Sequence, residues 1–375
     1  MSKPLYPKRV MIIAGEASGD IHGARLVTAM KKKNNELIFC GVGGNELKSA
    51  GVKIVIDSSK FAVVGITEAI SKIFYLIKGM AKTKRFLKSF NPDLLILIDF
   101  PDFNLNIASA AKKLGIPVLY YISPQAWAWR QGRVKKIKKL VNHLAVILPF
   151  EETFFRKHGI SVTYVGHPLL DGDSLPAEFE KKKDIPVVGL LPGSRDSEVA
   201  RHLPVMLEAA VLIRKRMGNV RFVVSLASTV ERQYVEKIIM EHSGNDFEVV
   251  PEHVRRVFEM CSLVVAASGT VTLEAAIAGI PMVIIYKVSP VSYWLGKILI
   301  KVSSIGLVNL IAGREIVPEL IQGKASPINI ANEILRILED SNTIETMRNE
   351  LAGIRNLLGG PGASERVADI AMGML

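Results

Sequence analysis

The feature that most constrains this chain is a recurring unit: a short, continuous apolar run, a turn rich in Gly, Pro or Asp, and a segment with helical periodicity. The apolar runs occupy residues 10–14, 38–42, 94–98 and 118–122 in the first half, and 187–191, 221–226, 247–250, 263–267 and 282–286 in the second. Because strands that are apolar throughout are buried on both faces, these runs predict parallel sheets covered by helices. Two successive series predict an α/β fold with two doubly wound, Rossmann-like domains.

The break between the two series sets the expected domain boundary. Residues 168–186 are rich in Pro, Asp, Gly and Lys and lack periodicity, which is typical of a linker. We therefore expect one domain at 1–170, a linker at 171–186 and a second domain at 187–375, whose final helices either stay within it or pack back on the first. Ligands of open α/β sheets bind beyond the carboxyl ends of strands, so a cleft between the domains is the expected site.

Charge and composition narrow the classes of partner. Residues 1–170 hold 26 Lys and Arg against 11 Asp and Glu, whereas residues 171–375 hold 22 against 25. The basic half predicts an anionic partner, which is a nucleic acid, an acidic ligand or a membrane surface. The two cysteines, far apart, argue against a disulfide framework or a zinc site. The longest uncharged stretch, 115–129, contains two prolines, so we expect no membrane-spanning helix.

Two loops that follow strands in the second half are candidate nucleotide sites. Ser194 and Arg195 stand where a strand ends and a helix opens, and the Arg195 guanidinium matches phosphate oxygens in geometry. A surface arginine beside a capped helix is the structural alternative. Neither this loop nor the one at 267–276 matches the GxxxxGK[ST] or GxGxxG pattern, which argues against ATP hydrolysis and nicotinamide binding.

The second loop, at 267–276, combines small residues with one carboxylate. Ser268, Gly269 and Thr270 follow the strand and allow a ligand to approach the backbone. Glu274 lies one turn further on, where its carboxylate would accept hydrogen bonds from ribose hydroxyls. A capping box is the structural alternative, but it requires a spacing of three residues, and Glu274 lies four after Thr270.

The first half offers a candidate base. Asp99 ends the strand at 94–98, and partial burial there would raise the pKa of its carboxyl and make it a better general base. A turn cap beside Pro101 is the alternative. Glu16, Ser18 and Asp20 follow the first strand and are candidate cleft or acceptor residues. The glycines around them also fit close packing of a helix on a sheet.

Two further segments suggest contact with lipid. Lys78, Lys82 and Arg85 share a predicted helix with Tyr75 and Phe86, and aromatic residues among basic ones suit an anionic bilayer surface. A solvated helix face is the alternative. On a helical wheel, the opposite side is a broad apolar face of Ile70, Ile73, Phe74, Ile77, Met80 and Ala81. The apolar stretch 286–313 predicts a lid or an acyl-chain contact in addition to core packing.

The motifs, taken together and in order, resemble those of the lipid-A-disaccharide synthases, inverting glycosyltransferases of family 19 with the GT-B fold. The matching segments are AGEASGDIHGARL, VVGITEAI, LILIDFPDFN, YYISPQAWAWRQGRVKKIKK, LPFE, VGHPL, LPGSRDSEV, ASGTVTLEAAIAGIPMVIIYK and NLIAGREIVPEL. They run almost from end to end of the chain. Phe100 departs from the pattern, in which an Ala is common at this position.

The resemblance implies a reaction in which UDP-2,3-diacylglucosamine glycosylates 2,3-diacylglucosamine 1-phosphate (lipid X) at the cytoplasmic face of the inner membrane. It implies that Asp99 is the base, that Arg195 and the loop 268–270 hold the diphosphate, and that Glu274 holds the ribose. It places Asn309 and Arg314 in the cleft as well. It implies neither a metal nor a cofactor, and it suggests a homodimer.

Two other functions stay open at this point. A nucleotide-sugar epimerase of the same fold would use the same donor loops but would need no lipid-binding face. A nucleic-acid-binding protein would use the basic first half, although the sequence contains no recognition motif and a parallel-sheet cleft argues against it. We therefore expect no nucleic-acid partner.

Overall fold

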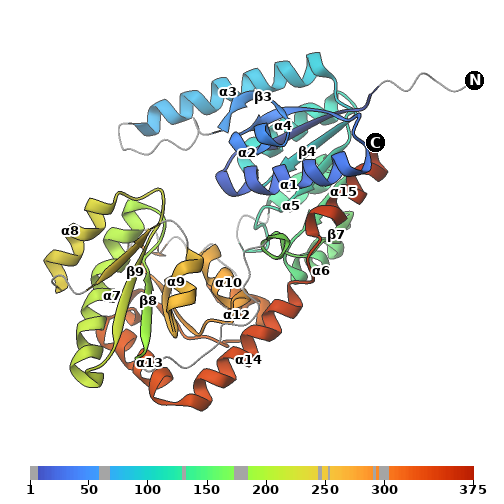
Figure 1. Cartoon of the computed structure of the whole chain (residues 1–375). Coiled ribbons are helices and arrows are strands. Elements are labelled where there is room, and N and C mark those ends of the chain that lie inside the picture. Colours follow the sequence, from blue (N-terminus) through green and yellow to red (C-terminus); the bar gives the residue numbers. More distant parts are fainter. Residues whose placement is uncertain are drawn as a thin grey trace, which may run out of the picture. The chain divides into compact units, whose positions relative to one another are not determined.

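The computed structural model describes residues 7–58, 68–128, 132–172, 185–243, 247–251, 254–289, 293–294 and 304–375, without the side chains of 68–75 and Ser243. The chain divides into two compact units (Figure 1). The first comprises Met1–Asp171 and Leu358–Leu375, and the second comprises Gly172–Leu357. Each unit is built on its own parallel sheet.

The first unit has a seven-stranded sheet in the order β3-β2-β1-β4-β5-β6-β7, with every pair of neighbours parallel. Its strands are β1 (Arg9–Ala14), β2 (Ile38–Gly43), β3 (Lys53–Asp57), β4 (Leu94–Ile98), β5 (Val118–Tyr121), β6 (His143–Val146) and β7 (Val162–Tyr164). The strand order reverses between β1 and β4. A parallel sheet opens a crevice at such a switch point, at the carboxyl ends of the two strands.

Helices cover both faces of this sheet, as the continuous apolar strands predict. One face packs against α1 (Ala17–Lys33), α2 (Asn45–Ser49) and α15 (Ala363–Met374). The other packs against α3 (Glu68–Phe90), α4 (Pro101–Lys113), α5 (Gly132–Leu140) and α6 (Pro149–Lys157). Alternate residues of β1 show why, since Met11 and Ile13 enter one core and Val10, Ile12 and Ala14 the other.

The second unit has a six-stranded parallel sheet in the order β10-β9-β8-β11-β12-β13, which switches between β8 and β11. The strands are β8 (Val187–Leu191), β9 (Arg221–Leu226), β10 (Glu248–Pro251), β11 (Leu263–Ala267), β12 (Met282–Tyr286) and β13 (Glu319–Ile321). Its helices are α7 (Asp196–Met217), α8 (Arg232–Ser243), α9 (Val254–Met260), α10 (Thr270–Ile277), α12 (Leu307–Ala312), α13 (Pro327–Glu339) and α14 (Ser341–Leu357), and η3 (Gln322–Lys324) is a short 3₁₀ turn.

The structure confirms the nine strands and the doubly wound α/β class that the sequence predicts, with ends shifted by one residue or so. Four strands were missed: β3, β6, β7 and β13. They are short or lie at the edge of a sheet, and β3 and β13 are only partly buried. Without a long buried run they lack the signal that identified the others.

The C-terminal helix α15 belongs to the first unit, where it packs against α1. Asp171, at the end of the 3₁₀ turn η2 (Pro168–Asp171), caps its N-terminus. The Asp171 carboxylate accepts hydrogen bonds of 2.8 Å from the backbone N–H groups of Gly362, Ala363 and Ser364, and one of 2.7 Å from the Ser364 hydroxyl. Most of the expected linker, residues 173–184, lies outside the described residues.

The described helices include none that is both long and apolar enough to cross a membrane.

We expect Asp171→Ala to destabilise the first unit by about 1–3 kcal/mol, because it removes all four capping hydrogen bonds from the α15 N-terminus. The matched control is Asp369→Ala, which removes an exposed ion pair between the same helix and Lys33 of α1 and should cost about 0–1 kcal/mol. Urea unfolding of the two variants measures the difference, and equal midpoints would contradict the capping role of Asp171.

Candidate active site

A pocket lies in the second unit at the switch point between β8 and β11. Its volume is about 480 Å³, and it is lined by the loops that follow β8, β9 and β11. All six residues predicted to bind the nucleotide line it: Ser194, Arg195, Ser268, Gly269, Thr270 and Glu274. Two loops that are far apart in the sequence therefore meet where the strand order reverses, because the carboxyl ends of parallel strands share one edge of the sheet.

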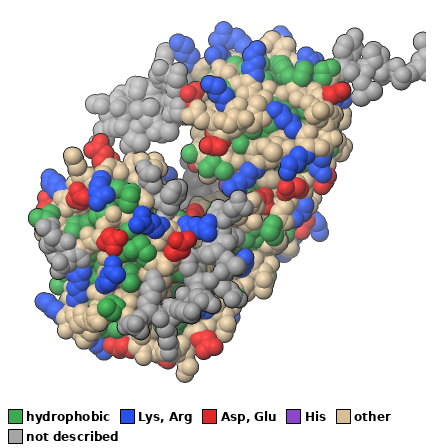
Figure 2. Space-filling view, viewed as in Figure 1, with side chains coloured by type: hydrophobic (Ala, Val, Ile, Leu, Met, Phe, Trp, Pro, Cys, Tyr) green, Lys and Arg blue, Asp and Glu red, His purple; other side chains and the backbone are tan. Residues whose placement is uncertain are grey.

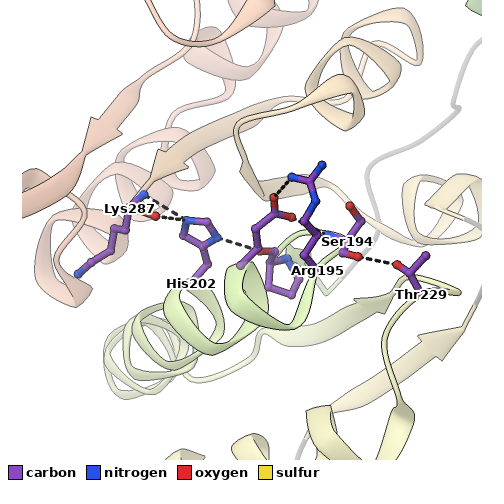
Figure 3. Close-up of polar contacts among 7 residues, drawn as sticks. Ser194, Arg195, His202, Thr229 and Lys287 are labelled. Atoms are coloured by element: carbon purple, nitrogen blue, oxygen red, sulfur yellow. Dashed lines mark hydrogen bonds and ion pairs between the residues drawn. The ribbon is translucent and has the colours of Figure 1, made fainter. Parts of the chain in front are cut away.

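The loop after β8 presents hydrogen-bond donors to this pocket. Arg195 is the N-cap of α7, and 76% of its side chain is exposed. The Thr229 hydroxyl donates to the Ser194 carbonyl and ties the loop to the end of β9 (Figure 3). The Glu198 carboxylate accepts a hydrogen bond from the Ser194 N–H at 2.9 Å and one from the Arg195 guanidinium at 2.8 Å.

A buried histidine, His202, hydrogen-bonds the backbone of this loop. His202, only 2% exposed, lies on α7 with Nδ1 2.9 Å from the Pro192 carbonyl and Nε2 3.1 Å from the Lys287 N–H (Figure 3). With the proton on Nδ1, the neutral ring donates to the first group and accepts from the second. Burial lowers the pKa of His202, which favours this neutral form. The ring thus joins the β8 loop to the end of β12.

Glu274 lies on the first turns of α10, and its carboxylate lines the pocket. Burial raises the pKa of this carboxyl, since desolvation disfavours the charged form. The capping alternative does not hold, because the N-cap of α10, Gly269, has no side-chain cap hydrogen bond and no described residue donates to the Glu274 carboxylate. The carboxylate is therefore placed to accept hydrogen bonds from a ligand.

In the first unit, Asp99 lies at the switch point between β1 and β4, in a strained corner. Asp99 and Phe100 adopt left-handed φ angles of 44° and 48°, and Ile122, after the neighbouring strand, has a φ of 60°. Such angles cost about 1–3 kcal/mol each in residues other than glycine and cluster at functional sites.

Buried neighbours hold this corner in place. The Tyr120 hydroxyl and the Asn104 amide each donate to the Asp99 carbonyl at 2.6 Å. The Asp99 N–H donates to the Tyr121 carbonyl at 3.2 Å. The Phe100 ring lies over Gly15, where a Cβ atom would collide with it, so the loops after β1 and β4 meet closely.

Two effects raise the pKa of the Asp99 carboxyl. Burial, and after it the negative charge of Glu16 at the start of α1, raises the pKa of Asp99 to about 6, against an opposing hydrogen bond from the Phe100 N–H. A carboxyl of this kind is a better proton acceptor than an ordinary aspartate and is still ionised at neutral pH. Glu16, the N-cap of α1, and Ser18, on the first turn of that helix, are both exposed.

Three other candidate residues have structural partners instead. Asp20 is 5% exposed, and its carboxylate caps α2 by accepting from the N–H groups of Gly44, Glu46 and Leu47. Asn309 is 1% exposed, and its amide bonds the backbone of residues 316 and 317 and the Glu319 carboxylate.

Arg314 forms a two-oxygen ion pair with Glu350 at 2.6 Å and lines a different hollow, on the side of α13 and α14. The geometry therefore gives no support to a ligand role for Asp20, Asn309 or Arg314. Asp20 was a candidate because it follows the first strand, and the family resemblance alone suggested Asn309 and Arg314. Hydrogen bonds to loop backbone explain Asp20 and Asn309.

The predicted lipid-binding helix, α3, differs from the expected arrangement. Phe86 stacks on Phe90 at 5.4 Å between ring centroids and packs against the core, so its predicted place among the exposed lysines is wrong. Ile77, assigned to the opposite apolar face, is 62% exposed and lies beside Lys78. Lys78, Lys82 and Arg85 are exposed, and basic side chains lie over this helix in Figure 2. The Tyr75 side chain lies outside the described residues.

Sequence reasoning missed part of the pocket lining. Ser225 and Ser228 line it from the end of β9, the neighbour of β8, and Glu198 received no role although its segment was singled out. Because all carboxyl ends of a parallel sheet lie at one edge, the loop after β9 could also have been predicted to line the pocket. Residues 290–292 and 295–303 of the predicted apolar lid at 286–313 lie outside the described residues. Where side chains are described, no group of three His, Cys, Asp or Glu residues forms a metal site.

Comparison with known proteins gives a consistent result. Residues 10–365 match the family model described as lipid-A-disaccharide synthetase. The chain is 48% identical over 375 residues to the lipid-A-disaccharide synthase of Geobacter metallireducens, covering 98% of this chain and 97% of that protein. It is 46% identical to the one from Syntrophus aciditrophicus, covering 98% of each.

Among solved structures, the UDP-GlcNAc 2-epimerase of Neisseria meningitidis bound to UDP-GlcNAc has a TM-score of 0.67 at 14% identity, covering 97% of this chain and 100% of that one. At that identity the likeness shows the fold alone, and it confirms the predicted GT-B type. The family itself follows from the relatives that match over the full length. This chain belongs to the lipid-A-disaccharide synthase family of glycosyltransferases.

Proposed function

We propose that this chain transfers diacylglucosamine from UDP-2,3-diacylglucosamine to lipid X, forming the β-1′,6-linked disaccharide 1-phosphate and UDP. The observation that carries the proposal is the pocket at the β8/β11 switch point, which is lined by an arginine, the starts of two helices and a partly buried carboxylate. The assay that tests it mixes the protein with both diacyl substrates and measures disaccharide and UDP. Release of neither product would contradict the proposed function.

The second unit is proposed to bind the donor. Arg195 and the loop of Ser268, Gly269 and Thr270 would hold the diphosphate, because backbone N–H groups at a helix start and a guanidinium both favour phosphate oxygens. Glu274 would accept hydrogen bonds from the uridine ribose. As UDP departs, the same donors would stabilise the negative charge that develops on its leaving oxygen.

The first unit is proposed to bind the acceptor and to supply the base. Asp99 would take the proton of the acceptor 6-hydroxyl while that oxygen forms a bond to the anomeric carbon of the donor. The bond from this carbon to the diphosphate oxygen breaks, and UDP leaves with the electron pair. Attack from the face opposite the leaving group inverts the anomeric configuration. A pKa near 6 suits this step, because Asp99 is deprotonated at neutral pH yet more basic than an ordinary aspartate.

We expect Asp99→Asn to lower turnover by about two to four orders of magnitude, because the amide cannot accept the hydroxyl proton. Binding of UDP should be unchanged, since Asp99 is not part of the donor pocket. The matched control is Asp102→Asn, which alters a carboxylate that is paired with Arg133 and lies three residues away. Turnover close to wild type in the Asp99 variant would contradict its role as the base.

We expect Arg195→Ala to weaken UDP binding by about threefold to thirtyfold, as the loss of an exposed charge-assisted hydrogen bond predicts. Turnover should fall as well. Arg232→Ala removes an exposed arginine that is paired with Glu236 outside the pocket, and it should leave binding unchanged. Isothermal titration calorimetry with UDP separates the two, and an unchanged affinity in the Arg195 variant would refute this contact.

We also propose that the protein acts as a peripheral protein on the cytoplasmic face of the inner membrane, where both lipid substrates lie. The support is α3, on which exposed Ile77 lies among Lys78, Lys82 and Arg85. An apolar side chain among cations suits an anionic lipid surface. A homodimer rests on the family resemblance alone, and sedimentation velocity measures it.

Binding to phosphatidylglycerol-containing vesicles should increase with the anionic lipid fraction and decrease with salt, since screening weakens the attraction. Replacing Lys78, Lys82 and Arg85 of α3 by Gln should reduce it strongly. The control replaces Lys135, Lys136 and Lys139, exposed on α5, and removes the same charge from the same unit. Equal loss in both triple variants, measured by vesicle sedimentation, would show that net charge, not α3, directs binding.

A further inference from the structure

The donor pocket contains one carboxylate that the proposed reaction does not use. Glu198, on the first turn of α7, lines the pocket together with Ser194 and Arg195. One of its oxygens accepts the Ser194 N–H at 2.9 Å, and the other accepts from the Arg195 guanidinium at 2.8 Å. Figure 3 shows the second contact as the dashed line from Arg195. These are two of the donors that a diphosphate would need.

The turn at Gly193, in the loop after β8, leaves room for the Glu198 side chain. Gly193 has a left-handed φ of 123°, and a Cβ atom at that position would fall 2.6 Å from a Glu198 carboxylate oxygen and 2.7 Å from its Cβ. Only glycine leaves room for Glu198 to fold back over the loop. The Glu198 side chain remains 30% exposed, so its carboxylate can move out into water.

We propose that Glu198 occupies the anion position of the donor pocket and that the diphosphate must displace it. The inference rests on the proposed function, since it concerns the same pocket. The single Ser194 N–H already donates to Glu198, so a phosphate oxygen can take this donor only if the carboxylate leaves. The Arg195 guanidinium has further N–H groups, but a carboxylate that stays beside it repels the phosphate charge. The carboxylate therefore lowers the affinity for every ligand that places a phosphate group there and speeds the release of UDP.

The structure offers one alternative role for Glu198, which is to hold Arg195 in place for the ligand. The two roles predict opposite signs. If Glu198 competes with the diphosphate, its neutralisation tightens UDP binding, whereas if it orients Arg195, neutralisation weakens UDP binding.

The test compares UDP affinity by calorimetry in the wild type, Glu198→Gln and Glu333→Gln. Glutamine keeps the shape of Glu198 and an acceptor for the Ser194 N–H but carries no charge. Glu333 is the matched control: like Glu198 it pairs with an arginine three residues away, Arg336, and it is 31% exposed, but it lies outside the pocket.

We expect Glu198→Gln to bind UDP about threefold to tenfold more tightly, as the loss of one competing charge-assisted contact predicts, and to release it correspondingly more slowly. Glu333→Gln should bind like the wild type. Uridine, which carries no phosphate, should show no gain in the Glu198 variant. A stopped-flow measurement of UDP release provides the second readout, and Glu198→Ala should shift in the same direction.

Unchanged or weaker UDP binding by Glu198→Gln, with a normal wild type, would overturn this inference and leave the proposed function intact. An equal gain for uridine would overturn it too, because the effect would not depend on phosphate. A wild type that does not bind UDP would instead contradict the proposed function, and the inference would fall with it.

Discussion

The constraint on which the rest of the structure depends is the parallel pairing of strands that are buried on both faces. In a parallel ladder every strand runs in the same direction, so all carboxyl ends lie at one edge of the sheet. Each unit reverses its strand order once, between β1 and β4 or between β8 and β11. The topology of the sheets therefore places the loops that carry Asp99 and Arg195 at the switch points. Polar side chains can be accessible there, because these edges lie outside the apolar cores.

The candidate sites of the two units differ in the charges that surround them. The second unit has a small excess of acidic residues, yet its pocket is lined by a guanidinium and by the starts of two helices, so the local groups differ in sign from the net charge. The first unit keeps one carboxyl partly buried beside a second negative charge, which raises its pKa instead of pairing it with a cation. The strain of the left-handed corner is compensated by buried hydrogen bonds from Tyr120 and Asn104.

The sequence alone predicts the fold well where its signal is strong. Long buried runs identify nine strands, and small or charged residues directly after them identify the pocket, because strand ends are the positions where polar residues are accessible. The failures have physical reasons too. Asp20 satisfies backbone groups of a loop that is distant in sequence, which no local pattern reveals. Asn309 satisfies the loop that follows its own helix, and its residue type alone does not distinguish this role from ligand binding. Phe86 and Ile77 differ from expectation because a helical wheel gives relative directions but not which side meets the core. The sequence places Glu198 four residues after Ser194, but it does not show that the two groups are in contact. That contact depends on the backbone turn at Gly193.

We propose that the corner after β4 makes Asp99 a stronger base than an ordinary aspartate. The most direct test of this proposal is a titration of the Asp99 carboxyl by carbon-13 NMR, with the signal assigned by its absence in Asp99→Asn. Our account predicts an apparent pKa near 6 in the wild type and a lower one in Glu16→Gln, because burial makes the largest contribution and the Glu16 charge adds to it. An Asp99 carboxyl that titrates at its ordinary value of 3.8 in both proteins would contradict the account.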